Sequence, residues 1–231
     1  MSANNRRFLL AAVATSAVLS FPQAGDASVA RAVEFNEKVD NAAVIVVGRC
    51  TKAEARWDAQ KRQILTYATF KVDKALKGQA SEITVATPGG TVDGIHQETI
   101  GSPIFEPGDE QLLFVANSSI GPTVLYLAQG AYDVRSDERG QKVVEPVQSD
   151  VVRMDTQRGI AVAPEQPRTL DQLEREVRTR IAARRTEMAA LQQKQAQPSA
   201  SLMDVLARTK ALGMLALVGA ALATWQLMKQ R

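Results

Sequence analysis

The chain contains very few residues suited to covalent or metal chemistry. Its 231 residues include one cysteine and one histidine, and aromatic residues make up only 5%. A single cysteine excludes an intrachain disulfide framework and a zinc site built on several thiolates, and a single histidine excludes a His-rich metal site. We therefore predict no metal site and no cofactor. The 45% hydrophobic content excludes a wholly disordered chain, and the length allows one core-forming domain with appendages.

The N-terminal residues are typical of an export signal. Two arginines precede an apolar stretch from Phe8 to Leu19. As a helix this stretch reaches about 18 Å, well short of a hydrocarbon core of about 30 Å. Small residues follow, and the small-x-small pattern predicts cleavage after Ala30 or Ala32. We assign residues 1–30 to a signal peptide; an uncleaved N-terminal anchor is the alternative.

A second apolar segment, residues 211–228, lies near the C-terminus. It contains no charged residue, would be about 27 Å long as a helix, and has Trp225 near one end, where interfacial aromatics are common. The alternatives are a buried helix of the soluble domain and a helix lying flat on the membrane; the absence of a polar face argues against the soluble helix. We predict a transmembrane anchor with a cytoplasmic tail at 229–231. Together with the export signal, it predicts a protein of the bacterial inner membrane whose main domain is periplasmic.

Charge divides the chain between these two signals. Acidic side chains outnumber basic ones up to residue 163, and basic ones predominate beyond it. A Pro-bearing stretch lies at the change and indicates a linker. We therefore expect a β domain, a linker, an amphipathic stalk helix and a second linker at residues 31–163, 164–168, 169–196 and 197–210.

Short apolar runs punctuated by glycine and proline predict a mainly β fold for the first of these regions. The expected strands are residues 42–47, 64–76, 82–87, 111–116, 123–127, 131–135 and 142–147, with one or two helical turns at 33–39. We expect the first strand to end at Gly48. Several short strands at this spacing indicate a small barrel or a sandwich.

The long segment from Pro88 to Gly108 is rich in glycine. Loops of this length in compact domains are usually functional or disordered unless a hidden strand divides them, and residues 97–100 are the candidate strand. The segment is a candidate binding edge, and turns with a β-bulge at a barrel rim are the alternative interpretation. The candidate binding residues are Gly89, Gly90, Gly94, His96, Glu98 and Phe105.

The order of elements between residues 33 and 135 resembles a known domain. An apolar strand at 44–49 ends in Gly-basic, Tyr67-x-x-Phe70-x-Val72 leads into Lys77-Gly78, and Phe105-x-x-Gly108 precedes the strand Leu112-Leu113-Phe114. This order is similar to the OB-fold domain of the netrin-module and tissue-inhibitor-of-metalloproteinases group, in the cysteine-free form of exported bacterial proteins. The resemblance implies a small OB-like barrel.

The resemblance does not carry the inhibitor's activity to this chain. In that family a cysteine at the mature N-terminus binds the protease zinc through its amine and carbonyl, whereas this chain has no cysteine before Cys50. The family's disulfides are missing as well. No functional residue can therefore be transferred by position.

The predicted stalk helix has a narrow apolar stripe. Thr169 is a candidate N-cap with Gln172 three residues on. The stripe suits packing on the β domain or pairing with a second copy of the chain, and the anchor helix offers a second route to a homo-oligomer. The helix arginines suit a solvated face with the pairs Glu174–Arg178 and Glu176–Arg180, or attraction to anionic lipid.

No set of residues predicts catalysis. His96 and Glu98 would share one face of a strand, where the carboxylate could orient the imidazole, but a solvated turn histidine is the simpler interpretation. Asp109 and Glu110 are adjacent, and successive strand side chains point apart, which argues against an acid–base pair. The acidic balance of the β domain offers no basic groove for nucleic acid.

These observations favour a non-enzymatic, membrane-anchored domain that binds a protein or another component of the cell envelope. Two alternatives stay open. One is a regulator of an exported protease that uses the segment 88–108 as its contact edge. The other is a hydrolase with a site near His96.

Overall fold

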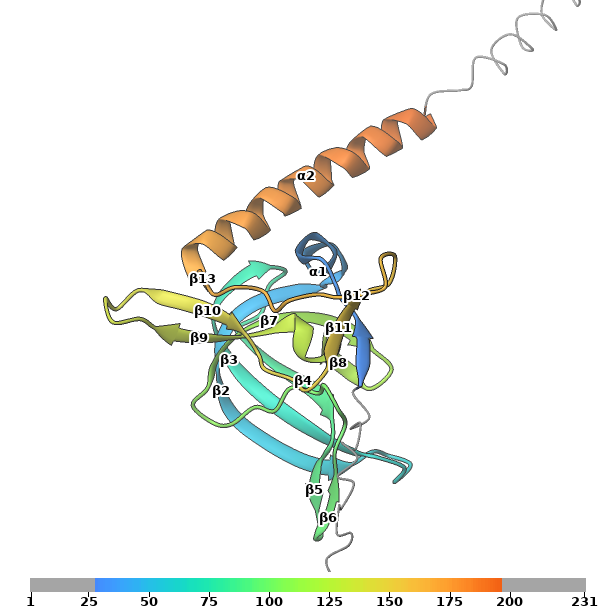
Figure 1. Ribbon diagram of the computed structural model, residues 1–231, viewed down its shortest axis with the longest axis vertical. Coiled ribbons are helices and arrows are strands. Elements are labelled where there is room, and N and C mark those ends of the chain that lie inside the picture. The colour runs from blue at the N-terminus through green and yellow to red at the C-terminus, as the bar shows by residue number, and fades with distance from the viewer. Residues whose placement is uncertain (1–27, 197–231) are drawn as a thin grey trace, which may run out of the picture.

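The computed structural model describes residues 28–196 and is mainly β (Figure 1). Most of the expected signal peptide, the second linker and the expected membrane anchor lie outside these residues. Within residues 28–196, no helix combines the length and the hydropathy needed to cross a bilayer.

Eight strands form the main sheet, and neighbouring strands run antiparallel. Their order is β13-β10-β9-β7-β2-β3-β4, with β8 paired to β7. The strands are β2 Val44–Trp57, β3 Ile64–Lys77, β4 Glu82–Pro88, β7 Glu110–Ser118, β8 Gly121–Val124, β9 Ala131–Ser136, β10 Lys142–Pro146 and β13 Arg168–Thr169. The sheet curls until β4 lies against β8, but no ladder joins these strands in the described chain, so the expected barrel is not closed.

The seven predicted strands all appear, and the largest difference in length is at β2. The prediction ended this strand at Gly48, whereas it continues to Trp57. A Cβ at position 48 would lie 2.5 Å from the carbonyl oxygen of Lys71, and the β2–β3 register shifts between Val47 and Gly48. Gly48 therefore permits a close backbone approach inside a strand instead of ending it.

The main sheet buries side chains on both faces. On β2, Val46 belongs to the core enclosed by the curled sheet, whereas Ile45 and Val47 belong to the core under the helices. This alternation follows the two-residue period of a strand. We call the two sides the inner face and the helix-covered face.

Smaller elements surround this sheet. Three short strands form a second sheet in the order β1-β11-β12, and β5 pairs with β6 as a hairpin. Their bounds, with those of two short helices, are β1 Val29–Arg31, β5 Gly90–Val92, β6 Ile95–Gln97, β11 Val152–Asp155, β12 Ile160–Ala161, α1 Phe35–Asn41 and η1 Leu127–Gly130. The prediction placed the hidden strand at 97–100, so it was two residues too late, and it missed the second sheet.

The long helix α2, Leu170–Ala196, begins as predicted: the Gln172 amide donates to Thr169 Oγ1 at 3.2 Å. Its first turns pack on the sheet, with Leu173 and Val177 fully buried in the helix-covered core. Further along, Met188 and Leu191 are exposed, and the end of the helix projects beyond the body (Figure 1). The first part of the apolar stripe is therefore packed on the sheet, and the rest is exposed on the projecting part of α2.

The ion pairs of α2 differ in part from the prediction. Arg178 and Glu174 pair at 3.3 Å as expected. Arg180, however, pairs with Asp40 of α1 at 2.5 Å and with Glu187 at 3.0 Å, and Glu176 pairs with Arg168. The predicted Glu176–Arg180 pair is replaced because tertiary partners lie closer.

Candidate functional site

A cleft of about 630 Å³ lies at the end of the molecule that carries the β5–β6 hairpin. Its walls come from the segment 87–105, from residues 148–150 between β10 and β11, and from Thr66 and Ser28. Five of the six predicted binding residues line it: Gly89, Gly90, His96, Glu98 and Phe105. Gly94 lies at the hairpin turn and is not part of the lining. The volume is within the range of about 300–1,000 Å³ typical of ligand pockets.

The hairpin wall is built by a two-residue turn. Val92 and Ile95 are paired, and Asp93 and Gly94 between them have φ of 51° and 77°. Two successive positive φ values are the signature of a type I′ turn, for which Asp-Gly is a preferred sequence. The Asp-Gly dipeptide was a readable signal for this hairpin that the sequence prediction did not use.

Gly89 and Gly90 bring the hairpin against the main sheet. Both have positive φ, and a Cβ at position 90 would lie 2.7 Å from Ala55 Cβ and from Thr66 Oγ1. The Gly89 amide donates to the Ile64 carbonyl at 2.9 Å, and its carbonyl accepts from Thr66 Oγ1 at 2.8 Å. These two glycines therefore act in the architecture of the cleft.

The opposite wall, residues 98–105, is fixed at two points. The Phe105 ring is buried and packs edge-on against Phe70, with ring centroids 5.1 Å apart. The Gly101 carbonyl accepts from the Ala128 amide at 2.9 Å. Fixed walls mean that the cleft is preformed, which lowers the ordering cost of binding.

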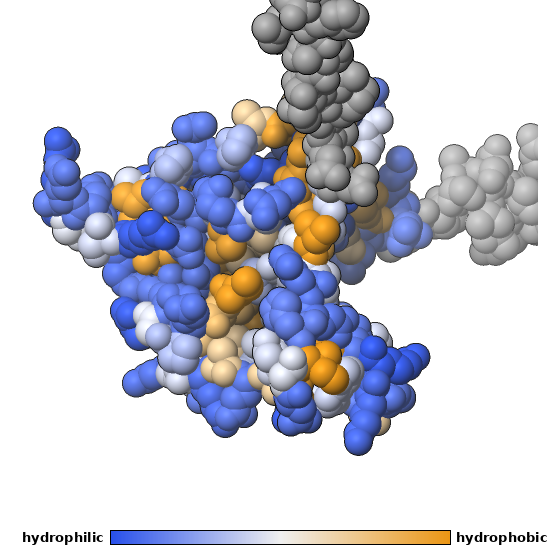
Figure 2. All heavy atoms as spheres, turned by 60° about the horizontal axis from the view of Figure 1, so that its bottom comes forward, coloured by the Kyte–Doolittle hydropathy of each residue, from blue (hydrophilic) through white to orange (hydrophobic). Residues whose placement is uncertain are grey.

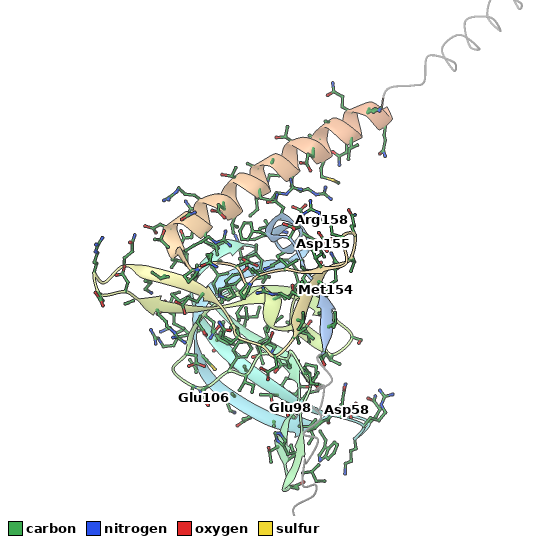
Figure 3. All side chains as sticks on the ribbon, in the orientation of Figure 1. Asp58, Glu98, Glu106, Met154, Asp155 and Arg158 are labelled. Carbon is green, nitrogen blue, oxygen red and sulfur yellow. The ribbon has the colours of Figure 1, made fainter. Side chains whose placement is uncertain are left out.

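The cleft has an apolar rim and an acidic balance. Ile104 is 83% exposed and Ile100 is 52% exposed. The charged lining residues in the described chain are Glu98 and Asp150; no lysine or arginine is among them. Figure 2 shows hydrophobic surface gathered in a hollow between hydrophilic lobes on this face, and Figure 3 places Glu98 beside the hairpin, at the opposite end from α2.

One polar atom in the cleft lacks an internal partner. The hydroxyl of Ser102, which lines the cleft, is buried and makes no hydrogen bond within residues 28–196. A buried hydroxyl without a partner costs free energy comparable to a lost hydrogen bond. The Ser102 hydroxyl is therefore an unsatisfied polar group beside the cleft.

The cleft does not assemble the histidine–carboxylate pair considered from the sequence. His96 Nδ1 lies 3.0 Å from Thr91 Oγ1, its cross-strand neighbour, and no hydrogen bond joins His96 to Glu98 in the described chain. Nor do residues 28–196 contain a group of three or more His, Cys, Asp and Glu side chains that could hold a metal ion. The lone Cys50 is buried in the inner core, and burial raises the pKa of its thiol.

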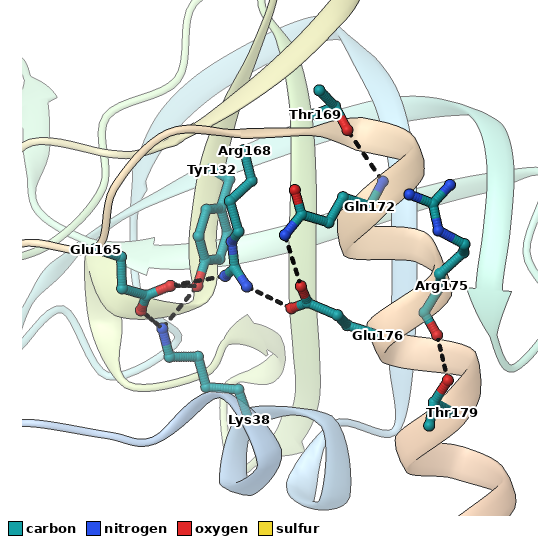
Figure 4. A network of polar contacts seen from close by, with 9 residues as sticks. All are labelled: Lys38, Tyr132, Glu165, Arg168, Thr169, Gln172, Arg175, Glu176 and Thr179. Carbon is teal, nitrogen blue, oxygen red and sulfur yellow. Dashed lines mark hydrogen bonds and ion pairs between the residues drawn. The ribbon is translucent and has the colours of Figure 1, made fainter.

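A second polar cluster lies on the helix-covered face (Figure 4). Lys38 of α1 is only 1% exposed, and its Nζ donates to the Tyr132 hydroxyl at 2.7 Å and to Glu165. The Tyr132 hydroxyl in turn donates to Glu165 at 2.8 Å. Arg168 joins Glu165 to Glu176 of α2. We call these five residues the latch.

Burial and charge set the protonation of the latch. Burial lowers the pKa of Lys38, although the Glu165 carboxylate opposes the shift. Burial alone would raise the pKa of Glu165, but the Lys38 charge and the hydrogen bonds from Lys38 and Tyr132 lower it overall. Burial also raises the pKa of Tyr132 well above its usual value. The pKa shifts of Glu165 and Tyr132 favour a charged carboxylate and a neutral tyrosine, and Lys38 Nζ donates to both groups.

The latch joins α1, β9, the expected linker and α2, and its polar groups bond one another. A smaller cavity of about 340 Å³ borders the latch at Glu165 and Arg168, but the geometry of the latch accounts for how α2 is held. We therefore assign it a structural role and keep the cleft as the candidate functional site. Sequence reasoning missed the latch because nothing marks Lys38 as buried or pairs it with a residue 127 positions away.

No protein-family model, curated protein or solved structure matches this chain.

Proposed function

We propose that this protein is an exported, membrane-anchored binding protein whose cleft receives an extended segment of another protein of the cell envelope. The export and anchor signals of the sequence support the location. The preformed cleft with exposed isoleucines at its rim is the observation that carries the binding role.

The lining suits a peptide better than an anionic ligand. An isoleucine gains about 1.5–3 kcal/mol when it is buried from full exposure. Ile104, which is 83% exposed, would gain most of this on binding, and Ile100, which is 52% exposed, would gain less. Thr99 and the Nε2 group of Gln97 supply uncharged hydrogen-bonding groups in the lining, which match the amides of an extended chain. The Oε1 atom of Gln97 is already used, because it accepts from the Ile64 amide at 2.7 Å. Glu98 and Asp150 disfavour phosphate and carboxylate ligands and favour neutral or basic segments.

We also propose that residues 33–135 form an OB-like domain of the netrin-module type. The curled antiparallel sheet, with β4 lying against β8, supports this proposal. The cysteines through which that family acts are absent at the matching positions, so binding here would use the cleft. An exported protease is the alternative partner of the cleft, and its recovery in the crosslinking experiment below would favour that alternative.

Site-specific photo-crosslinking in living cells tests the proposal. A photoreactive residue replaces Ile104 in the full-length chain, and the control carries it at Ile160, which is 53% exposed on β12 outside the cleft. We expect a discrete crosslinked protein from position 104 and a yield at least about tenfold lower from position 160, since only the first lies at the binding surface.

A second substitution separates specific from adventitious capture. Gly101 supports the loop, because a Cβ there would lie 2.7 Å from Val151. Gly101→Val in the position-104 background should therefore reduce the crosslink, whereas the exposed Gly140→Val should not. Equal crosslinking from positions 104 and 160, or turnover of an envelope ester or peptide abolished by His96→Ala, would contradict a binding role.

A further inference from the structure

The segment that contains the two expected cleavage positions is built into the fold. Strand β1 pairs in parallel with β11, with Val29, Ala30 and Arg31 opposite Val152, Arg153 and Met154. Two further backbone bonds bracket the ladder: the Val152 amide donates to Ser28 at 2.9 Å, and the Ala32 amide donates to Met154 at 2.8 Å. Within the described residues, backbone pairing is thus present from Ser28 onward.

Side chains lock the same segment to α1 and η1. The Arg31 guanidinium donates two hydrogen bonds to Glu37, at 2.9 and 2.6 Å. The Gln129 side chain holds the backbone on both sides of Ala32: it donates to the Arg31 carbonyl at 3.0 Å and accepts from the Val33 amide at 3.1 Å. Residues 28–33 are thus held by three separate elements.

Cleavage at either position expected from the sequence would damage this arrangement. A cut after Ala30 removes two of the three β1 residues. A cut after Ala32 removes the whole strand and the Arg31–Glu37 pair, and it leaves β11 without its parallel partner. The mature domain keeps the whole of β1 only if the leader is cut before Val29, and it keeps the Val152–Ser28 hydrogen bond as well only if the leader is cut before Ser28.

The sequence offers a suitable bond at that point. Gly25-Asp26-Ala27 places small residues at the third and first positions before the Ala27–Ser28 bond, which is the pattern that leader cleavage requires. We infer that the leader is removed between Ala27 and Ser28, not after Ala30 or Ala32. This inference rests on the export part of the proposed function and is independent of the binding role.

Cleavage there has a consequence for the cleft. Ser28 lines the cleft together with Asp150 and Glu98. An α-amino group has a pKa of about 8 and is mostly protonated at neutral pH. Processing would therefore place one positive charge at the mouth of a cleft whose described lining has acidic side chains and no basic ones except His96. The mature protein would present a more nearly neutral cleft than the precursor.

The N-terminus of the processed protein tests the inference. The full-length chain, with its own leader and a C-terminal tag, is expressed in a Gram-negative bacterium and purified from membranes. We expect intact mass and N-terminal sequencing to give Ser28-Val29-Ala30-Arg31. A mature protein that begins at Arg31 or Val33, or a chain that keeps its leader, would overturn the inference.

Two matched substitutions make the test independent of how well each variant folds. Ala27→Phe blocks the inferred bond, and Ala30→Phe blocks both alternatives, because residue 30 precedes one bond directly and is third before the other. Pulse labelling reads processing before any misfolded product is degraded. We expect Ala27→Phe to reduce cleavage about tenfold or more and Ala30→Phe to be cut between Ala27 and Ser28 as in the wild type. The opposite pattern would refute the inference, whatever the crosslinking of the cleft shows.

Discussion

The helix-covered face and the cleft end of the inner face are closed in different ways. On the helix-covered face, apolar side chains from α1, α2 and four strands are buried, and the charges of the latch are paired with one another. At the cleft, Ile104 is exposed and the Ser102 hydroxyl has no internal partner. On the helix-covered face the buried charges are paired with one another, whereas at the cleft apolar side chains remain exposed and the charged side chains Glu98 and Asp150 line the surface.

This difference separates residues that stabilise the domain from residues that can bind. A closed polar network offers nothing to a ligand until it is broken, at a large cost. An exposed isoleucine can be replaced at little cost to folding. Substitutions on the two regions should therefore give opposite profiles of stability and binding.

The largest effect is expected from the latch. Glu165→Gln leaves Lys38 buried beside Arg168 without a carboxylate. We expect a loss of about 3 kcal/mol in the free energy of unfolding, the lower end for one-sided removal of a buried ion pair, because the Glu165 side chain keeps 27% exposure. Urea unfolding of the full chain in detergent, followed by circular dichroism, measures it.

The double variant Lys38→Met with Glu165→Gln is the control for this prediction. It removes both charges, so it should recover more than half of the loss. A double variant no more stable than Glu165→Gln would show that the buried charge is not the cause. Cleft crosslinking should survive in both variants wherever they remain folded.

A smaller effect is expected at the cleft glycines. At Gly90 the φ of 135° and a Cβ contact of 2.7 Å to Ala55 and Thr66 both oppose a side chain. Gly90→Ala should therefore cost about 2 kcal/mol and reduce crosslinking from position 104. Gly94→Ala is the matched control, because φ is 77° with nothing within 4 Å of a Cβ, and it should cost about 1 kcal/mol. Equal costs in urea unfolding would mean that the close approach at Gly90 is unimportant.

The sequence was informative where local pattern decides structure. Alternation and turn residues located β3 within one residue, and the long Gly-rich segment did contain the cleft wall. The Asp93-Gly94 turn was also readable, but the prediction considered residues 97–100 instead. Local sequence signals thus predicted seven strands of the main sheet and most of the candidate site.

The sequence did not predict contacts between segments that lie far apart in the chain and have no clear hydrophobic pattern. Strand β1 has three residues and pairs in parallel with a strand more than 120 positions away, so neither length nor alternation marks it. Lys38 looks like any helix-surface lysine, and its burial depends on Tyr132 and Glu165 arriving from elsewhere. The cleft walls at 148–150 are likewise set by the second sheet.

The smallest effect is expected at the Arg31–Glu37 pair, which joins β1 to α1 at the surface. The Arg31 hydrogen bonds lower the pKa of Glu37 from its usual 4.5 to about 2. A carboxyl whose pKa is lower in the folded chain stabilises the fold above the unfolded pKa, and this contribution disappears as pH falls from 4.5 toward 2. Because the pair is partly exposed, Glu37→Gln should cost only about 0.5–1 kcal/mol at pH 7.

The pH dependence of the stability difference shows whether the Arg31–Glu37 ion pair stabilises the fold. The difference in unfolding free energy between wild type and Glu37→Gln should be constant from pH 5 to 7 and should shrink below pH 4.5, as the wild-type carboxylate is protonated. A difference as large at pH 2.5 as at pH 7 would assign the loss to packing of the Gln side chain, because most of the carboxylate contribution is lost by pH 2.5. Because Arg31 belongs to β1, a chain cut after Ala32 would lack the pair and would keep only the Tyr126 hydrogen bond to Glu37. The difference between the two variants should then be smaller at pH 7 than in the chain that keeps Arg31.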